Sequence, residues 1–125
     1  MGSQLRLSRI GKSMNLISRD ELKEKLDRGD EFKLVCALGE WAFQAKHIPG
    51  SLHIDNPKHV EESLNPADEI VVYCSDPACP SSKYAYHTLI RLGFENVRRY
   101  EGGISDWEAA GLPLEGVGAD GEEPG

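Results

Sequence analysis

The chain has 125 residues, a length that suits one compact domain and is short for two. It is 39% hydrophobic and 28% charged, which permits a packed core and excludes wholesale disorder. The formal net charge of −7 argues against nucleic acid as the main partner, because binding to phosphate needs a basic surface. No apolar run approaches the ~20 residues of a membrane span. We therefore expect a cytoplasmic protein with no membrane partner.

The two ends of the chain differ in charge. Residues 1–14 carry three basic and no acidic side chains, whereas residues 115–125 carry four acidic and no basic ones. Glycine is frequent in the second segment, which is typical of a solvated tail. We expect a flexible N-terminal segment over 1–14, a folded domain over 15–114 and an acidic, glycine-rich tail over 115–125. A monomer is the default expectation.

The first predicted element is a helix over residues 19–28. Ser18 is a plausible N-cap, and Glu21 three positions later completes a capping box. Gly29 offers a C-cap. The mostly apolar run at 32–37 then predicts a strand that is buried on both faces.

The rest of the chain continues this alternation of helices and strands. Short helices are predicted over 40–46 and 57–64, with a short strand over 51–54 between them. The β-branched run Ile70–Tyr73 is the strongest strand signal in the chain. After it come a loop, a helix to about Leu92, a strand over 97–100 and a helix over 104–110. This order predicts an α/β fold with a parallel sheet and helices on both faces.

Cys74 follows the strongest strand and opens a loop that leads into a helix. Ligands of open parallel sheets bind beyond the carboxyl ends of the strands. Pro80 fits the first position of the following helix, so the loop amides and the helix N-terminus can converge on the Cys74 sulfur. That environment would lower the pKa of the thiol and would also hold a sulfur oxyanion. The alternative is that Cys74 is a small buried hydrophobic residue.

The cysteine pattern favours thiol chemistry over a disulfide or a metal. The chain has three cysteines, Cys36, Cys74 and Cys79, and an odd count is a poor disulfide framework. Cys74 and Cys79 have C-x4-C spacing rather than the C-x2-C of a zinc knuckle, and the four histidines are scattered. We expect no metal and no cofactor.

Four motifs in one order carry a resemblance to a known family. They are H-I-P-G-S at 47–51, I-V-V-Y-C at 70–74, L-G-F-E-N-V at 92–97, and Y-E-G-G-I-S-D-W at 100–107 followed by A-G-L-P at 110–113. Together they resemble the rhodanese-like sulfurtransferase domain over about residues 15–114. The resemblance implies a five-stranded parallel sheet flanked by helices on both faces.

The resemblance also implies a reaction and a site. Cys74 would attack the outer sulfur of thiosulfate or a similar sulfane donor, become a persulfide, and pass that sulfur to a thiol, to cyanide or to a protein partner. The substrate would be held by the backbone of the active loop and of the helix start: Ser75, Asp76, Pro77, Ala78, Cys79, Ser81 and Ser82.

Three departures from the family pattern bear on this expectation. Cys36 and Leu38 stand where the family usually has Asp and Arg. The active loop or helix start is about two residues longer than usual, and it lacks the arginine of the phosphatases that share the fold, with Lys83 as the nearest cation. Phosphatase activity is therefore not expected. Cys79 adds a second thiol in the loop.

Two roles stay open for each additional cysteine. Cys36 is either a buried strand residue or a resolving thiol, because its strand and that of Cys74 end on the same sheet edge. Cys79 is either a helix-start residue facing the sheet or a thiol that resolves a Cys74 persulfide. The sulfurtransferase hypothesis therefore has two alternatives: a dithiol redox protein using Cys74 and Cys79, and a catalytically silent binding module.

Overall fold

The computed structural model describes residues 14–54, 60 and 62–117. In these residues the elements are α2 (Arg19–Arg28), β1 (Lys33–Cys36), α3 (Glu40–Ala45), β2 (Leu52–His53), β3 (Ile70–Tyr73), α5 (Ser81–Arg91), β4 (Val97–Arg99) and α6 (Gly103–Ala109). The segments predicted to be flexible at the ends, 1–14 and 115–125, lie mostly outside the described residues. So do residues 57–59 and 61 of the helix expected over 57–64.

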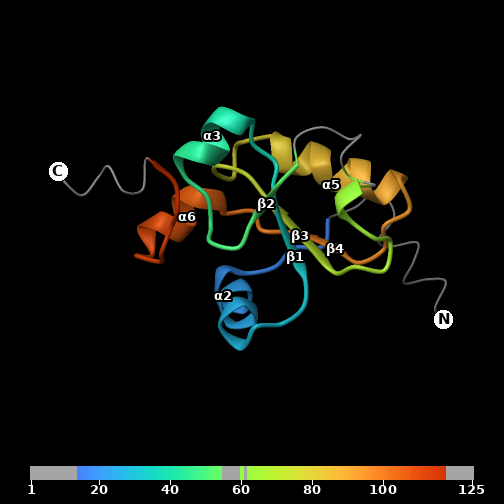
Figure 1. Cartoon of the computed structure of the whole chain (residues 1–125), viewed down its shortest axis with the longest axis horizontal. Helices are drawn as coiled ribbons and strands as arrows, with labels where there is room; N and C mark the ends of the chain where they lie inside the picture. The colour runs from blue at the N-terminus through green and yellow to red at the C-terminus, as the bar shows by residue number, and fades with distance from the viewer. Residues whose placement is uncertain (1–13, 55–59, 61, 118–125) are drawn as a thin grey trace.

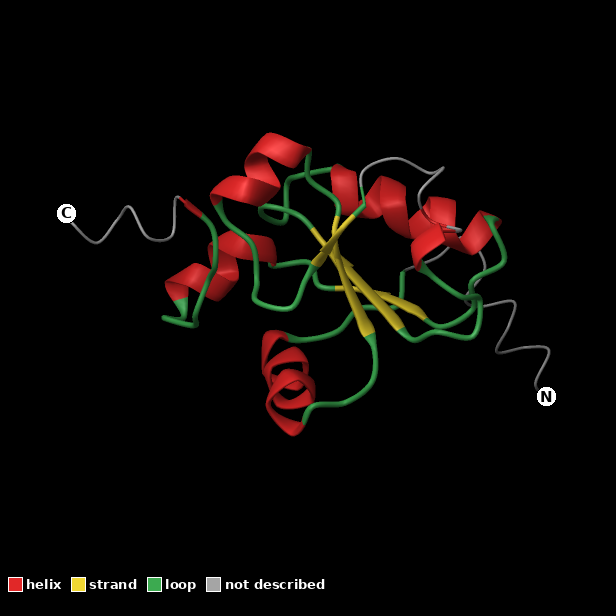
Figure 2. Ribbon diagram, in the orientation of Figure 1, coloured by secondary structure: helices red, strands yellow, loops and turns green. Residues whose placement is uncertain are grey.

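The strands form one parallel sheet in the order β2-β1-β3-β4 (Figure 1). All four residues of β3 pair with β1, and three of them also pair with β4. α5 covers one face of the sheet and α2 the opposite face (Figure 2). The predicted α/β architecture with helices on both faces is confirmed.

The expected count of five strands is not met in the described residues, where the sheet has four. A fifth position beside β4 is held only by a single parallel bridge between Leu16 and Arg99. Arg99 donates its N–H to the Asn15 carbonyl at 2.8 Å, and Ile17 donates to the Arg99 carbonyl at 3.0 Å. The pairing stops there because the Ser18 hydroxyl caps α2, accepting from the Glu21 amide at 3.1 Å.

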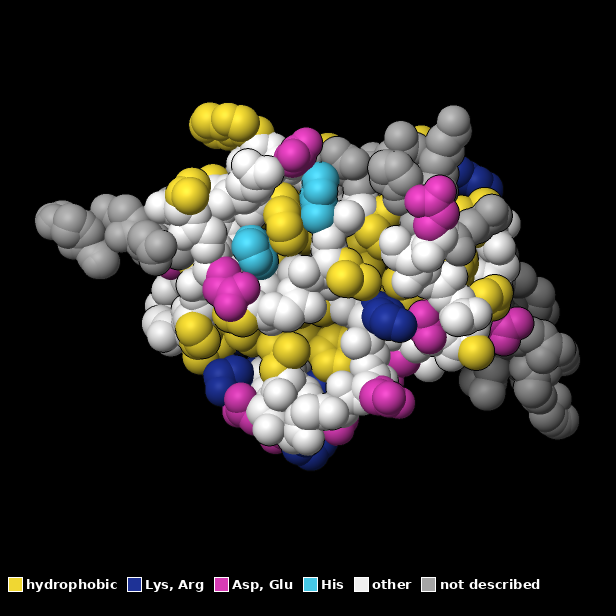
Figure 3. Space-filling model, viewed as in Figure 1, with side chains coloured by type: hydrophobic (Ala, Val, Ile, Leu, Met, Phe, Trp, Pro, Cys, Tyr) yellow, Lys and Arg dark blue, Asp and Glu magenta, His cyan; other side chains and the backbone are white. Residues whose placement is uncertain are grey.

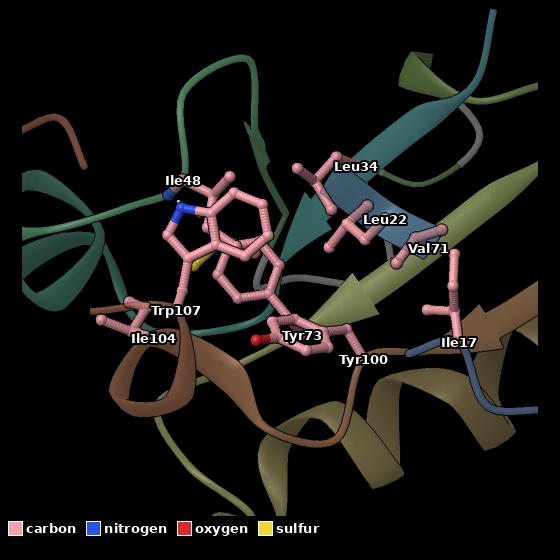
Figure 4. Packing of buried hydrophobic residues seen from close by; sticks show 10 residues of the cluster. Ile17, Leu22, Leu34, Ile48, Val71, Tyr73, Tyr100, Ile104 and Trp107 are labelled. Atoms are coloured by element: carbon pink, nitrogen blue, oxygen red, sulfur yellow. Dashed lines mark hydrogen bonds between the residues drawn. The ribbon is translucent and has the colours of Figure 1, made fainter. Parts of the chain in front are cut away.

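The sheet face that carries α2 and α6 is a closely packed apolar cluster (Figure 4). Trp107 of α6 is 1% exposed and donates its indole N–H to the Pro113 carbonyl at 2.8 Å. Tyr73 is fully buried, and its hydroxyl accepts from the Ile48 amide at 3.0 Å and contacts Ser51 Oγ at 2.6 Å. The large polar aromatic residues of this core therefore have their polar atoms satisfied.

The opposite face, which carries α5, is less completely filled. Val35, Val72 and Leu89 belong to its buried cluster. A cavity of about 490 Å³ lies between α5 and the sheet, lined mainly by apolar side chains. Thr88 of α5 also lines it, and its hydroxyl is buried without a hydrogen-bond partner.

The described chain continues past the expected domain end at residue 114. Glu115 and His47 exchange two backbone hydrogen bonds of 2.8 and 2.9 Å. This pairing ties the segment after α6 to the turn that leads into β2.

Candidate active site

Cys74 directly follows β3 at its carboxyl end, where the sequence placed it. Its side chain is only 1% exposed. The start of α6 lies against the backbone after it, because Ile104 donates to the Cys74 carbonyl at 3.0 Å and Ser105 to the Ser75 carbonyl at 2.8 Å. Gly103 has φ +67°, and a Cβ there would lie 2.5 Å from the Cys74 carbonyl oxygen. The second glycine of the G-G motif is therefore required by close backbone contact with the active loop.

The Cys74 sulfur is held mainly by the first turn of α5. The Ser82 amide donates to Cys74 Sγ at 3.3 Å, and Ser82 Oγ lies 3.2 Å from the same sulfur. The Cys79 carbonyl is 3.5 Å away on the loop side. Ser82 is therefore the main polar contact of the candidate nucleophile.

The loop amides do not converge on Cys74 as the sequence suggested. The amides of Ala78 and Cys79 donate to Asp76, to its carboxylate at 2.9 Å and its carbonyl at 3.0 Å respectively. Hydrogen bonds from the backbone of Ser75 and Ser81 go to the Cys79 thiol instead. The loop thus closes on itself through Asp76, and the backbone of Ser75 and Ser81 acts on the second cysteine.

The two cysteines of the loop influence each other's pKa, and the pKa values of their thiols shift in opposite directions. Burial, followed by the contact with Cys79, raises the pKa of Cys74, so the expected lowering of that pKa is wrong for this arrangement. Burial also acts to raise the pKa of Cys79, but the hydrogen bonds from Cys74, Ser75 and Ser81 outweigh it and lower that pKa to about 7. The more accessible thiol is therefore the more acidic one.

A buried arginine that the sequence analysis missed lies behind this site. Arg99 on β4 is 1% exposed, and its Nε donates to Ser82 Oγ at 2.8 Å. Lys83, the cation nearest to the loop in sequence, is exposed. The signal was present in the strand periodicity, because side chains alternate along β4 and Arg99 falls on the same face as Val97.

Cys36 lies on the other face of the sheet. It is fully buried in the cluster that contains Tyr73 and Trp107, whereas Cys74 contacts α5. Burial raises the pKa of Cys36. The structure therefore does not place Cys36 on the sheet face that carries the Cys74 sulfur.

The histidine of the H-I-P-G-S turn, His47, packs against the ring of Phe43. Phe43 of α3 stacks between His47, at 4.0 Å between ring centroids, and His53, at 4.9 Å. On the face seen in Figure 3, two histidine side chains flank an apolar one. His47 Nδ1 is 2.8 Å from the Phe43 carbonyl, so this stack fixes α3 against the turn.

Comparison with known proteins agrees with this geometry. A family model described as the rhodanese-like domain matches residues 18–110. The chain belongs to this family. Thiosulfate sulfurtransferase GlpE of Pseudomonas savastanoi is 34% identical over 79 residues, which cover 61% of this chain and 72% of that protein.

Two further relatives, both from Mycobacterium tuberculosis, are longer proteins. The HTH-type transcriptional regulator Rv0324 is 31% identical over 108 residues, and the putative thiosulfate sulfurtransferase SseA is 33% identical over 102. The matches cover 85% and 69% of this chain. They span 47% and 33% of those relatives, so the chain corresponds to half of their length or less.

Solved structures share the fold. The BH2092 protein from Bacillus halodurans gives a TM-score of 0.78 at 22% identity, with 94% of this chain and 88% of that chain covered. The rhodanese-like domain of the Anabaena Alr3790 protein gives 0.76 at 25% identity, with 85% and 82% covered. The rhodanese-like domain is thus supported by sequence and by fold.

The described residues contain neither a membrane-spanning helix nor a group of metal ligands. Across residues 14–54, 60 and 62–117, no helix is both long and apolar enough to cross a membrane. In the same part of the chain, no three His, Cys, Asp or Glu side chains gather as a metal-binding group.

Proposed function

We propose that the protein is a sulfurtransferase or sulfur carrier in which Cys74 is the nucleophile. The observation that supports this most is the position of Cys74 at the carboxyl end of β3, with its sulfur in contact with the N–H and the hydroxyl of Ser82. The amide donates to the sulfur, and the hydroxyl, which accepts from the neutral thiol, can donate to it once the sulfur is ionised; such charge-assisted hydrogen bonds are stronger than neutral ones. The three cysteines of the protein are free thiols, which suits the reducing conditions of a cytoplasm.

The reaction proceeds in two half-reactions. The Cys74 thiolate attacks the outer sulfur of thiosulfate, the bond between the two thiosulfate sulfurs breaks, and sulfite leaves with its electron pair. Cys74 is then a persulfide. In the second half, a thiol or cyanide attacks the outer sulfur and the Cys74 thiolate is regenerated.

The backbone around the active loop plays a more restricted part than the sequence suggested. Ser82 contacts the reacting sulfur, whereas the Ala78 and Cys79 amides are occupied by Asp76. Ser75 and Ser81 donate toward the Cys79 thiol. We therefore assign Ser82 the main role in holding the persulfide, and we keep the other loop residues as the wall of the substrate site.

Intact mass after incubation with thiosulfate tests the proposal. The wild type and Cys79→Ser should gain one sulfur atom, and Cys74→Ser should gain none. Cys79→Ser is the matched control, because it removes one thiol from the same loop. Absence of the gain in a folded wild type whose free thiols have been confirmed would overturn the proposal with this donor.

A dithiol role is the second candidate, and the position of Cys79, whose carbonyl oxygen is 3.5 Å from Cys74 Sγ, favours it. Cys79 would attack the inner sulfur of a Cys74 persulfide, forming a Cys74–Cys79 disulfide and releasing hydrogen sulfide. Cys36 is not assigned this resolving role, because it lies on the other sheet face. In this case the wild type would lose two hydrogens rather than gain sulfur, and Cys79→Ser would accumulate the persulfide.

The remaining candidate, a catalytically silent binding module, predicts a Cys74 that never reacts. Its presence at the strand end with a hydroxyl and an amide on its sulfur argues against that reading. The same mass experiment decides the point. The loop also lacks the bidentate arginine that a phosphatase would need, so a phosphoryl-transfer role is not proposed.

A further inference from the structure

Arg99 is a charged side chain in an unusual place. Its guanidinium is 1% exposed on the α5 face of the sheet. Arginine stays protonated in proteins, so the charge cannot be removed by losing a proton. Burial of an uncompensated charge is costly, and such groups are therefore expected to have a partner of opposite charge.

The compensation for this charge is incomplete in the described structure. The nearest carboxylate is that of Glu101, 3.6 Å from Nη1 and half exposed to solvent. Nη2 is buried without a hydrogen-bond partner. The short contact of the group is the 2.8 Å hydrogen bond from Nε to Ser82 Oγ. A buried cation thus lies one hydroxyl away from the candidate nucleophile.

The direction of the hydrogen bonds allows the Ser82 hydroxyl to donate to an anionic sulfur at Cys74. Ser82 Oγ accepts from Arg99, which leaves its own proton free to be donated. Cys74 Sγ lies 3.2 Å from that oxygen and 3.3 Å from the Ser82 amide. A negative sulfur at Cys74 would accept both the hydroxyl and the amide of Ser82, with the guanidinium behind them.

We propose that Arg99 is a positioning residue: through the Ser82 hydroxyl, its buried charge stabilises the anionic form of the Cys74 sulfur, whether thiolate or persulfide. The inference rests on the function proposed above, because it assigns a residue to the same site. It goes further by placing a structural cation on β4, far from the loop in sequence. Arg99 acts through Ser82 and does not itself touch the reacting sulfur.

Several groups influence the charge on Cys74. They are Cys79 from the loop, Cys36 from β1 and, through Ser82, Arg99 from β4 with its partner Glu101. Burial and Cys79 raise the pKa of the Cys74 thiol. Removing the cation should raise it further, because an opposite charge nearby favours the charged form of a group.

The pH profile of Cys74 alkylation tests the proposal. Iodoacetamide labelling of each cysteine is mapped by mass spectrometry in the wild type and in Arg99→Met. We expect the midpoint for Cys74 to move up by roughly one unit, so that labelling at neutral pH slows about tenfold. The midpoint is read independently of the plateau rate, which separates protonation from access to the buried sulfur.

Arg98→Met is the matched control. It removes the same charge from the neighbouring residue of β4, whose guanidinium instead pairs with Glu21 of α2 at 2.8 and 2.9 Å. The Cys74 midpoint should not move in this variant. An equal shift in both variants would indicate an effect of net charge and would overturn the proposal.

Two further variants test whether Arg99 acts through Ser82, and they give a result even if Arg99→Met does not fold. Ser82→Ala should raise the Cys74 midpoint, and adding Arg99→Met to it should raise it little more. Arg99→Lys should restore part of the wild-type midpoint. An unchanged midpoint in folded Arg99→Met, or in Ser82→Ala if the former does not fold, would overturn the proposal. Labelling needs no sulfur donor, so this result is independent of whether thiosulfate loads the protein.

Discussion

The two faces of the sheet differ in how completely side chains fill them. The face with α2 and α6 is filled by large aromatic side chains, and Trp107 and Tyr73 have their polar atoms satisfied. The face with α5 holds a cavity of about 490 Å³, an unpaired Thr88 hydroxyl and a buried arginine. The filled face therefore supplies stability, and the open face carries the sulfur of Cys74, the candidate nucleophile.

Trp107→Ala should produce the largest change, because it removes the biggest side chain of the filled face. We expect the free energy of unfolding to fall by about 3–5 kcal/mol, from lost burial, the cavity left behind and the lost hydrogen bond to Pro113. Urea denaturation measures it. Trp41→Ala is the control: that indole is 83% exposed, so its removal should change stability by no more than about 0.5 kcal/mol. Similar losses in both variants would contradict the comparison.

Tyr73→Phe tests the polar part of the same face. It removes the hydroxyl that accepts from the buried Ile48 amide and contacts Ser51. The unpaired amide should cost about 1–3 kcal/mol of stability. Tyr84→Phe, at a side chain 66% exposed, should cost almost nothing in the same denaturation experiment. Equal stability of Tyr73→Phe and wild type would show that water replaces the hydroxyl.

Cys79 and Cys36 should differ in how their alkylation rates depend on pH. The pKa of Cys79 is lowered to about 7, so its thiolate fraction and its alkylation rate should rise roughly fivefold from pH 6 to pH 7. Cys36 is fully buried with a raised pKa and should stay unlabelled over that range. Mass-mapped labelling distinguishes them. A Cys79 midpoint near the ordinary thiol value would refute the donor arrangement described for the loop.

Thr88→Val should have the smallest effect, with the opposite sign. The Thr88 hydroxyl lies buried beside the cavity without a partner, and valine has the same shape without the polar group. We expect a gain in stability of up to about 1 kcal/mol, measured by thermal or urea unfolding. Thr88→Ser keeps the hydroxyl and loses a methyl group, so it should be less stable than wild type. Destabilisation by valine would imply an ordered water on that hydroxyl.

Local patterns were sufficient to predict much of the fold. Ser18 and Gly29 define the helix between them, and the structure has α2 from Arg19 to Arg28. The run Ile70–Tyr73 is β3 without change. These elements depend on neighbouring residues, through capping bonds and the preference of β-branched side chains for strands.

The fifth strand and the surroundings of Cys74 were not predictable in the same way. The resemblance implied a fifth strand without placing it; in the structure the segment at 15–17 pairs with only one residue of β4 before α2 begins, so a single bridge forms there. Burial, followed by Cys79, raises the pKa of Cys74 against the expected direction, and the amides of Ala78 and Cys79 donate to Asp76 rather than to the sulfur. Both results depend on which of several nearby partners a backbone group selects.

The sequence by itself determined the alternation of helices and strands, the place of Cys74 at a strand end and the turn at Gly102-Gly103 before the last helix. These follow from short-range patterns. Only the tertiary structure decided that Arg99, seventeen residues from Ser82, shares a hydrogen bond with it, and that Cys36 faces away from α5. Charge and burial at the site depend on contacts between strands and helices, and such contacts are set by the packing of the whole sheet.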